Sequence, residues 1–229
     1  MQRSYDQLIH DIAIQNLPVT ICVDRAGIVG NDGETHQGLF DLAFLSEIPN
    51  FVIMAPKDFN EFNKMIEYAV NLEKPVAIRY PRGGEGKNKF ERCEDIDIGK
   101  AEIIKEGKDL SIVAIGKMVE RAVEVSQILE QQGIDAEIIN ARFLKPLDKK
   151  NILKSIEKTK KVVTMEDGIL NGGLYTNILD IINRSEIQNI KVIPFGYSDC
   201  FITHGSVNEL EKEMKTDVEN IIKQIFRGA

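Results

Sequence analysis

Residues 24–38, with the sequence D-R-A-G-I-V-G-N-D-G-E-T-H-Q-G, bring together side chains that could bind a small anion and move protons. Arg25 offers a guanidinium group, Asp32 a carboxylate, and His36 an imidazole, the type of side chain that most often transfers protons in enzymes. The glycines let the backbone turn where larger side chains would clash, and N-D-G favours a turn. We therefore predict that these three side chains face one anionic substrate. An ordinary surface loop with solvated charges is the alternative that the residues alone leave open.

The segment before this loop should place it at a ligand-binding edge. Residues 18–23 (P-V-T-I-C-V) are short, apolar and rich in β-branched side chains, which is typical of a buried strand in a parallel sheet. In open α/β sheets, ligands bind beyond the carboxyl ends of the strands. A further apolar strand is expected at 76–78, and it leads directly into R-Y-P-R-G-G.

Composition and charge argue against two classes of partner, nucleic acids and membranes. Its 229 residues, 43% of them hydrophobic, suffice for one large or two ordinary domains with a packed core. The net charge of −7 argues against a nucleic-acid partner, because neutralising phosphates needs a basic face. No apolar run is long enough to cross a bilayer, and the sequence opens on a polar amphipathic helix instead of a signal peptide. We expect no membrane partner and a cytoplasmic location.

The cysteines and histidines give little support to a metal site. The three cysteines are far apart and show no C-x-x-C spacing, which fits free thiols in a reducing compartment. The three histidines are equally scattered. We therefore predict no metal ligands in this chain.

The first part of the chain should form a short α/β unit. Apolar spacing predicts strands at 18–23, 50–54 and 76–78, with helices at 2–15, 39–45 and 58–70. Asp58 and Glu61 resemble a capping box at the start of the last of these helices. Because three strands are few for a stable sheet and residue 1 leads straight into a helix, we expect this sheet to be incomplete. The strand at 18–23 would then expose an edge that recruits another chain.

The second part should be a separate α/β domain. Residues 83–97 lose periodicity and fill with Gly, Lys and Glu, so we place domains at 1–84 and 98–229 and a linker at 85–97. Strands at 100–105 and 110–115 are expected to pair about the turn E-G-K-D. Further strands are predicted at 136–139, 162–165 and 191–194, and helices at 119–129, 149–157 (capped by Asp148) and 174–182. This alternation predicts largely parallel sheets.

The order of five segments resembles the 1-deoxy-D-xylulose-5-phosphate synthase family, within the transketolase-like thiamine diphosphate enzymes. They are Q-R-S-Y-D-Q (2–7), the 24–38 loop, R-Y-P-R-G (79–83), F-L-K-P-L-D (143–148) and N-G-G (171–173). The resemblance runs end to end but covers only the carboxyl-terminal part of that enzyme. It is specific in the long loop, because transketolases carry G-P-T-H-Q-P where this chain has G-E-T-H-Q-G. It implies an incomplete pyrimidine-binding-type domain followed by a transketolase C-terminal-type domain.

The resemblance also implies an activity and residue roles. The family uses thiamine diphosphate with Mg²⁺ to decarboxylate pyruvate and join the remaining two carbons to glyceraldehyde 3-phosphate, in isoprenoid precursor synthesis. Arg25 and Arg82 correspond to arginines that hold the substrate phosphate, and Arg3 to one at the aminopyrimidine end of the cofactor. His36 and Asp32 correspond to catalytic residues near the reactive thiazolium carbon. Without the resemblance, the two arginines could be surface or linker charges, Asp32 a turn residue, and His36 an ordinary loop histidine.

Three parts of the family's site are not in this sequence. They are the glutamate of an A-E-Q-H segment, the G-D-G domain that holds Mg²⁺ and the diphosphate, and an aromatic residue that stacks on the pyrimidine. The Mg²⁺ ligands are thus not in this chain. We expect it to be inactive alone, as a fragment or as one part of a split enzyme, and to form a homo-oligomer or bind a chain that supplies the rest. Two alternatives remain open: another transketolase-type transferase, and a noncatalytic α/β module that binds a phosphometabolite or a subunit.

Overall fold

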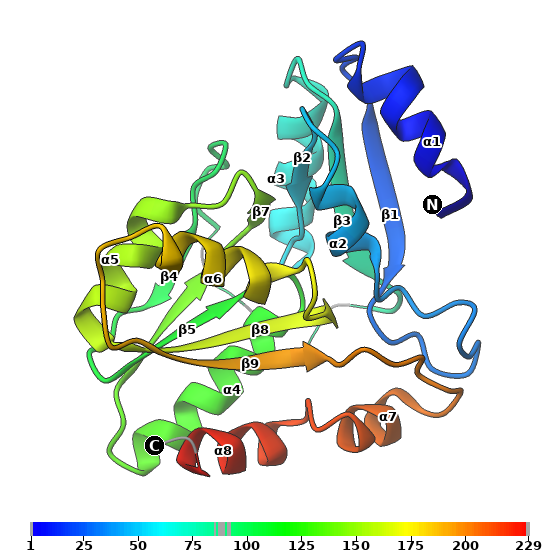
Figure 1. The fold of residues 1–229 in the computed structure, drawn as a ribbon. Helices are drawn as coiled ribbons and strands as arrows, with labels where there is room; N and C mark the ends of the chain where they lie inside the picture. The colour runs from blue at the N-terminus through cyan, green and yellow to red at the C-terminus, as the bar shows by residue number, and fades with distance from the viewer. Residues whose placement is uncertain (1, 85, 87–89, 91–92, 228–229) are drawn as a thin grey trace.

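The computed structural model describes residues 2–84, 86, 90 and 93–227, which form two sheets with helices packed around them (Figure 1). The strand order is β1-β3-β2-β7 in the first sheet and β4-β6-β5-β8-β9 in the second. The expected linker at 85–97 lies partly outside the described residues. No helix in the described ranges is long and apolar enough to cross a membrane.

The first sheet has the three expected parallel strands and one that was not expected. β1 (Thr20–Ala26) and β2 (Val52–Met54) both pair with β3 (Val76–Pro81), which lies between them. The fourth strand, β7 (Phe143–Lys145), comes from beyond the expected linker and pairs antiparallel with β2. It belongs to F-L-K-P-L-D, where the sequence predicted only a turn and a helix start. Three residues carry no period, so a pattern search has nothing to find there.

Three helical segments surround these strands. The N-terminal helix changes its hydrogen-bonding pattern along its length. It begins with a 3-10 turn at Gln2–Ser4 (η1), continues as an α-helical turn at Tyr5–Gln7 (α1) and ends as a π-helix at Leu8–Ala13 (η2). α2 covers Asp41–Ser46 and α3 covers Phe59–Val70. Leu8 of the N-terminal helix is buried in the same core cluster as Val23 of β1. On the edge of β1 that faces away from β3, no other strand is present in the described residues.

The start of α3 confirms half of the predicted capping box. The Asp58 carboxylate accepts a hydrogen bond from the Glu61 backbone N–H at 2.7 Å. The Glu61 carboxylate does not return a bond to Asp58; it accepts from the Lys57 backbone N–H at 2.7 Å, one residue earlier. Glu61 is thereby fixed at the first turn of the helix with its side chain buried.

The second sheet corrects the expected strand pairing. Its strands are β4 (Glu102–Lys105), β5 (Leu110–Ala114), β6 (Ala136–Asn140), β8 (Lys161–Ile169) and β9 (Lys191–Tyr197). The predicted hairpin of 100–105 with 110–115 is wrong: β4 pairs antiparallel with β6, while β5 lies between β6 and β8 and is parallel to both. Every residue of β5 is buried, which suits a central strand, whereas β4 is partly exposed and takes the edge.

Helices cover both faces of the second sheet (Figure 1). They are α4 (Met118–Gln131), α5 (Lys149–Thr159), α6 (Leu174–Asn183), α7 (Val207–Glu213) and α8 (Val218–Arg227). α4 and α8 share one apolar core with the sheet, and α5 and α6 share another that extends into the first sheet. Asp148 caps α5 as predicted, accepting from the Asn151 N–H at 3.1 Å. Helices α7 and α8 were not predicted, although Ser206 and Glu209 form a complete capping box.

Candidate functional site

Three of the predicted site residues meet at the carboxyl ends of two neighbouring strands. Arg25 lies near the end of β1, Arg82 directly follows β3, and Asp32 lies in the loop between β1 and α2. Arg82 Nη1 is 3.0 Å from Asp32 Oδ2, and Arg25 Nη1 is 3.6 Å from the same oxygen. We call these three residues the open cluster. Because β1 and β3 are parallel neighbours, the sheet itself brings both guanidinium groups to one carboxylate.

The open cluster is accessible and has spare positive charge. The side chains of Arg25, Asp32 and Arg82 are 45%, 33% and 57% exposed. Asp32 and Arg82 border a hollow of about 400 Å³ that is completed by Ser206 and Val207 of the second half of the chain. Among the interactions of the described residues, the two guanidinium groups share one carboxylate oxygen, which leaves N–H donors for a ligand, and such forks bind phosphate oxygens in pairs. The arrangement can therefore take up a small oxyanion.

The structure does not bring the other two predicted residues into this contact. His36 is exposed, its backbone N–H donates to the Gly33 carbonyl at 3.0 Å, and its Nδ1 lies 2.9 Å from Thr35 Oγ1. Arg3 is exposed on η1. Among the described residues, neither forms a hydrogen bond or ion pair with the open cluster.

The loop that carries Asp32 and His36 is closed at its base by backbone pairing. The Gly27 N–H donates to the Gly38 carbonyl at 2.7 Å, and the Gly38 N–H donates back at 2.8 Å. A Cβ atom on residue 38 would lie 2.1 Å from the Arg25 carbonyl oxygen, so only glycine allows this approach. The pairing makes 27–38 a closed loop whose ends are fixed.

A buried ion network beneath the loop was not predicted. Arg79 of β3 donates from Nε to both Asp41 carboxylate oxygens at 2.9 Å, from Nη1 to the Asp167 carboxylate of β8, and from Nη2 to the Gly38 carbonyl. Burial favours the neutral form of Asp167, but the charges of Arg79 and Lys117 outweigh it and hold the pKa of Asp167 below its usual value. Burial raises the pKa of Asp41. The sequence does hold one sign of this network: Arg79 lies inside an apolar strand, and a buried cation requires carboxylate partners.

A second buried ion network joins α3 to the second sheet and was also missed. Glu61 Oε1 lies 2.7 Å from Arg142 Nε and 3.3 Å from Lys57 Nζ, and Glu102 Oε2 lies 2.8 Å from Lys57 Nζ. Arg142 Nη2 is 3.1 Å from Glu102 Oε1, and Asn140 Nδ2 donates to both glutamates. We call these five residues the buried cluster. Each of the four charged side chains is at most 5% exposed, and each charge has an opposite partner.

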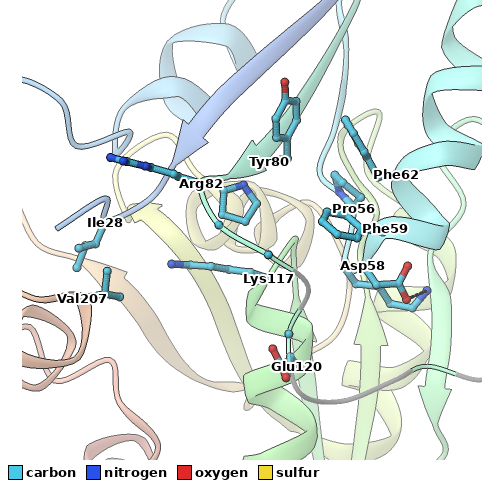
Figure 2. Close-up of a pocket in the computed structure, with 15 residues that line it drawn as sticks. Ile28, Pro56, Asp58, Phe59, Phe62, Tyr80, Arg82, Lys117, Glu120 and Val207 are labelled. Atoms are coloured by element: carbon cyan, nitrogen blue, oxygen red, sulfur yellow. Dashed lines mark ion pairs between the residues drawn. The ribbon is translucent and has the colours of Figure 1, made fainter. Parts of the chain in front are cut away.

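A second cavity of about 350 Å³ opens on the other side of Arg82 (Figure 2). Phe59, Phe62 and Tyr80 line it on one side, with the rings of Phe62 and Tyr80 4.6 Å apart. Lys117 extends across its lower part in Figure 2. The Lys117 ammonium is within 4.0 Å of both Asp167 and Glu211, so its charge is already balanced by two carboxylates.

The described residues hold no group of three or more His, Cys, Asp or Glu side chains that could bind a metal ion. The three cysteines, Cys22, Cys93 and Cys200, are free thiols. Among the described residues, the open cluster is an exposed group of charges in which two cations share one carboxylate, so it is the candidate site for an anionic ligand.

Two comparisons of sequence give the class of the protein. The family described as transketolase, C-terminal domain, matches residues 99–221, and the family described as transketolase, pyrimidine binding domain, matches residues 1–85. The chain therefore belongs to the transketolase family. The expected fold, a pyrimidine-binding unit followed by a C-terminal α/β unit, is confirmed, with the antiparallel β7 as an addition.

The curated relatives of the chain narrow the class further. It is 51% identical over 228 residues to a 1-deoxy-D-xylulose-5-phosphate synthase of Halothermothrix orenii, and 47% identical over 227 residues to one of Clostridium acetobutylicum. Each alignment covers 99% of this chain and 36% of the relative. The chain thus spans about a third of the length of these relatives.

Solved structures show the same fold. A split-gene transketolase, solved as an inactive β4 tetramer, superposes with a TM-score of 0.88 and 28% identity, covering 99% of this chain and 72% of that one. The transketolase of Campylobacter jejuni superposes with a TM-score of 0.73 and 21% identity, covering 91% of this chain and 31% of that one.

Proposed function

We propose that this chain carries the glyceraldehyde 3-phosphate side of the active site of a 1-deoxy-D-xylulose-5-phosphate synthase. The reaction is a thiamine-dependent transfer that decarboxylates pyruvate and joins the remaining two carbons to the aldehyde. The observation that carries the proposal is the convergence of Arg25 and Arg82 on one Asp32 oxygen. The identity of 45–51% to synthases of that name supports it.

The residue roles follow from the chemistry of each side chain. Arg25 and Arg82 bind the substrate phosphate through paired N–H donors. Asp32 pairs with the two guanidinium groups while the site is empty and competes with the phosphate for them. His36, exposed on the same loop, donates a hydrogen bond or a proton to the oxygen that develops charge during carbon–carbon bond formation. Arg3 contacts the aminopyrimidine end of the cofactor.

The described residues fit only part of the cofactor. Thiamine diphosphate supplies the electron sink for decarboxylation when it is bound. This chain offers it Arg3 and, among the described residues, no cluster of carboxylates for a metal ion. As the resemblance implies, we assign the sites of the diphosphate and Mg²⁺ to residues outside this chain.

We further propose that the chain works in an oligomer or with a chain that supplies the remaining residues. The likeness to a split-gene transketolase that was solved as an inactive tetramer of one kind of chain supports this assembly. A second support is that, in the described residues, β1 has a neighbouring strand on one side only, β3, and strand edges of this kind readily pair with another chain.

Calorimetric titration of the chain with inorganic phosphate and with glyceraldehyde 3-phosphate tests the binding role. Arg25→Ala and Arg82→Ala should each weaken binding by about 1.5–3 kcal/mol, or roughly 10- to 100-fold. Arg184→Ala is the matched control, because Arg184 also forms an exposed ion pair, with Asp180 on α6. Unchanged affinity in both cluster variants would exclude the phosphate role.

The assembled enzyme provides the second readout. Arg82→Ala should raise the KM for glyceraldehyde 3-phosphate and leave that for pyruvate unchanged, because only the former carries a phosphate. Equal damage to both substrates would instead assign Arg82 a role in folding.

A further inference from the structure

The middle of the 27–38 loop is attached to a segment far away in the sequence, residues 198–206, which joins β9 to α7. The connection is made by Gln37, a buried side chain that is only 4% exposed. Its Oε1 accepts a hydrogen bond from the Val29 backbone N–H at 2.7 Å, across the loop. Its Nε2 donates to the Thr203 backbone carbonyl at 3.1 Å. One amide group therefore ties the loop both to itself and to the second half of the chain.

The backbone of the loop confirms how closely these two segments pack. A Cβ atom on Gly30 would lie 3.0 Å from the Gly205 carbonyl oxygen, and one on Gly33 would lie 3.4 Å from His204 Cβ. Gly30 has φ +83, a conformation that side chains with a Cβ rarely adopt. The turn that carries Asp32 thus lies directly against residues 204–205. Any shift of 198–206 would move Asp32.

The hollow at the open cluster depends on the same contact. It is lined by Val29, Gly30 and Asp32 from the loop and by Ser206 and Val207 from the second half of the chain. Gln37 bonds to Val29 on one wall and to Thr203, close to the other. Since an unpaired buried amide is costly, each of the two bonds helps to keep Gln37 buried.

We propose that Gln37 is a positioning residue that sets the width of the anion site by holding the 27–38 loop against residues 198–206. It touches no substrate and acts through Val29 and Thr203. This inference rests on the proposed function for the identity of the anion, but the loop attachment itself does not. The second half of the chain then helps to form the anion site as well as stabilising the fold.

Hydrogen exchange of the full chain, measured well below its unfolding temperature, tests the attachment. Gln37→Met removes both bonds, so exchange should speed up at the Val29 amide and across 198–206. Gln37→Glu keeps the acceptor for Val29 and loses the donor to Thr203, so only 198–206 should exchange faster. Gln127→Met, at an exposed glutamine of α4, is the control and should change neither. Protection identical to wild type in both Gln37 variants would overturn the proposal.

Phosphate affinity of the same folded proteins gives the second readout, which a purely stabilising residue would not change. Inorganic phosphate should bind Gln37→Met roughly fivefold more weakly than Gln127→Met. Equal affinity would overturn the positioning role. If the wild type binds no phosphate while the exchange pattern follows the expectation, the proposed function fails and the attachment stands. Should Gln37→Met not fold, Gln37→Glu still decides the question through exchange.

Discussion

The buried cluster and the open cluster are made of the same kinds of side chain, yet they differ in balance and in access to water. In the buried cluster, Arg142 and Lys57 face Glu61 and Glu102, and the Asn140 side-chain amide donates further hydrogen bonds to both carboxylates. In the open cluster, two arginines share one carboxylate oxygen and all three side chains are at least a third exposed. The first arrangement has no capacity left for a ligand, whereas the second does.

The comparison shows that charge type alone does not distinguish a structural network from a binding site. Burial raises the cost of any unpaired charge, so a buried network is useful only when it is complete. Exposure makes an ion pair weak, so its partners can be exchanged for a ligand at little cost. An exposed cluster in which charges of one sign outnumber the other, on a backbone with a fixed position, is therefore a better indicator of a binding site than the types of charge alone.

The largest difference should appear when one arginine is removed from each cluster. Arg142→Met should lower the free energy of unfolding by about 3–5 kcal/mol, because it leaves Glu61 and Glu102 undercompensated in the interior. Arg82→Met should lower it by less than about 1 kcal/mol. Urea denaturation of both variants measures the two values. Similar losses at the two positions would mean that the open cluster is structural as well.

A smaller effect is expected from Asp32→Asn, which removes the carboxylate that competes for the two guanidinium groups. Phosphate should then bind about fivefold more tightly, since the repulsion between two unit charges about 4 Å apart is ~1 kcal/mol in water. Calorimetry on Asp32→Asn and wild type gives the ratio. Weaker binding in the variant would show that Asp32 helps to form the site instead of competing for it.

The smallest effect is a pH dependence that belongs to the buried cluster. Burial alone would raise the pKa of Glu102, but the hydrogen bond and charge of Lys57, with the charge of Arg142, hold this pKa below its usual value. Because the folded-state pKa is the lower one, the stabilisation is present above the unfolded-state pKa and is lost as the pH falls through the folded-state pKa. Unfolding free energies measured from about pH 6 to pH 3 should therefore fall less steeply for Glu102→Gln. An unchanged slope would rule out this contribution.

The parts of the fold with a regular apolar period could be predicted, and the parts without one could not. The strands at β1, β2, β3, β6, β8 and β9 and the caps at Asp58 and Asp148 have local signals in the residues themselves. β5 lies between β6 and β8 because it is the more completely buried strand. The sequence of residues 100–115 alone resembles a hairpin and does not show which later strands will cover β5. β7 is too short to show a period.

The site divides in the same way. Arg25, Asp32 and Arg82 could be found because they belong to loops that follow apolar strands, and the structure brings them together. Gln37 and Arg79 depend on contacts with Thr203 and Asp167, which lie more than 85 positions away, and no spacing rule connects them. The roles of all five predicted site residues, Arg3, Arg25, Asp32, His36 and Arg82, stay predictions.

The order in which the chain is made adds a constraint of its own. β2 finds its antiparallel neighbour only in residues 143–145, so the first sheet reaches its final width after β4, β5 and β6 of the second sheet have been synthesised. Until then the edge of β2 that will pair with β7 has no strand partner, although all three residues of β2 are buried in the folded protein. The two halves are therefore interleaved along the chain, and dividing the gene between them would remove the last strand from one sheet.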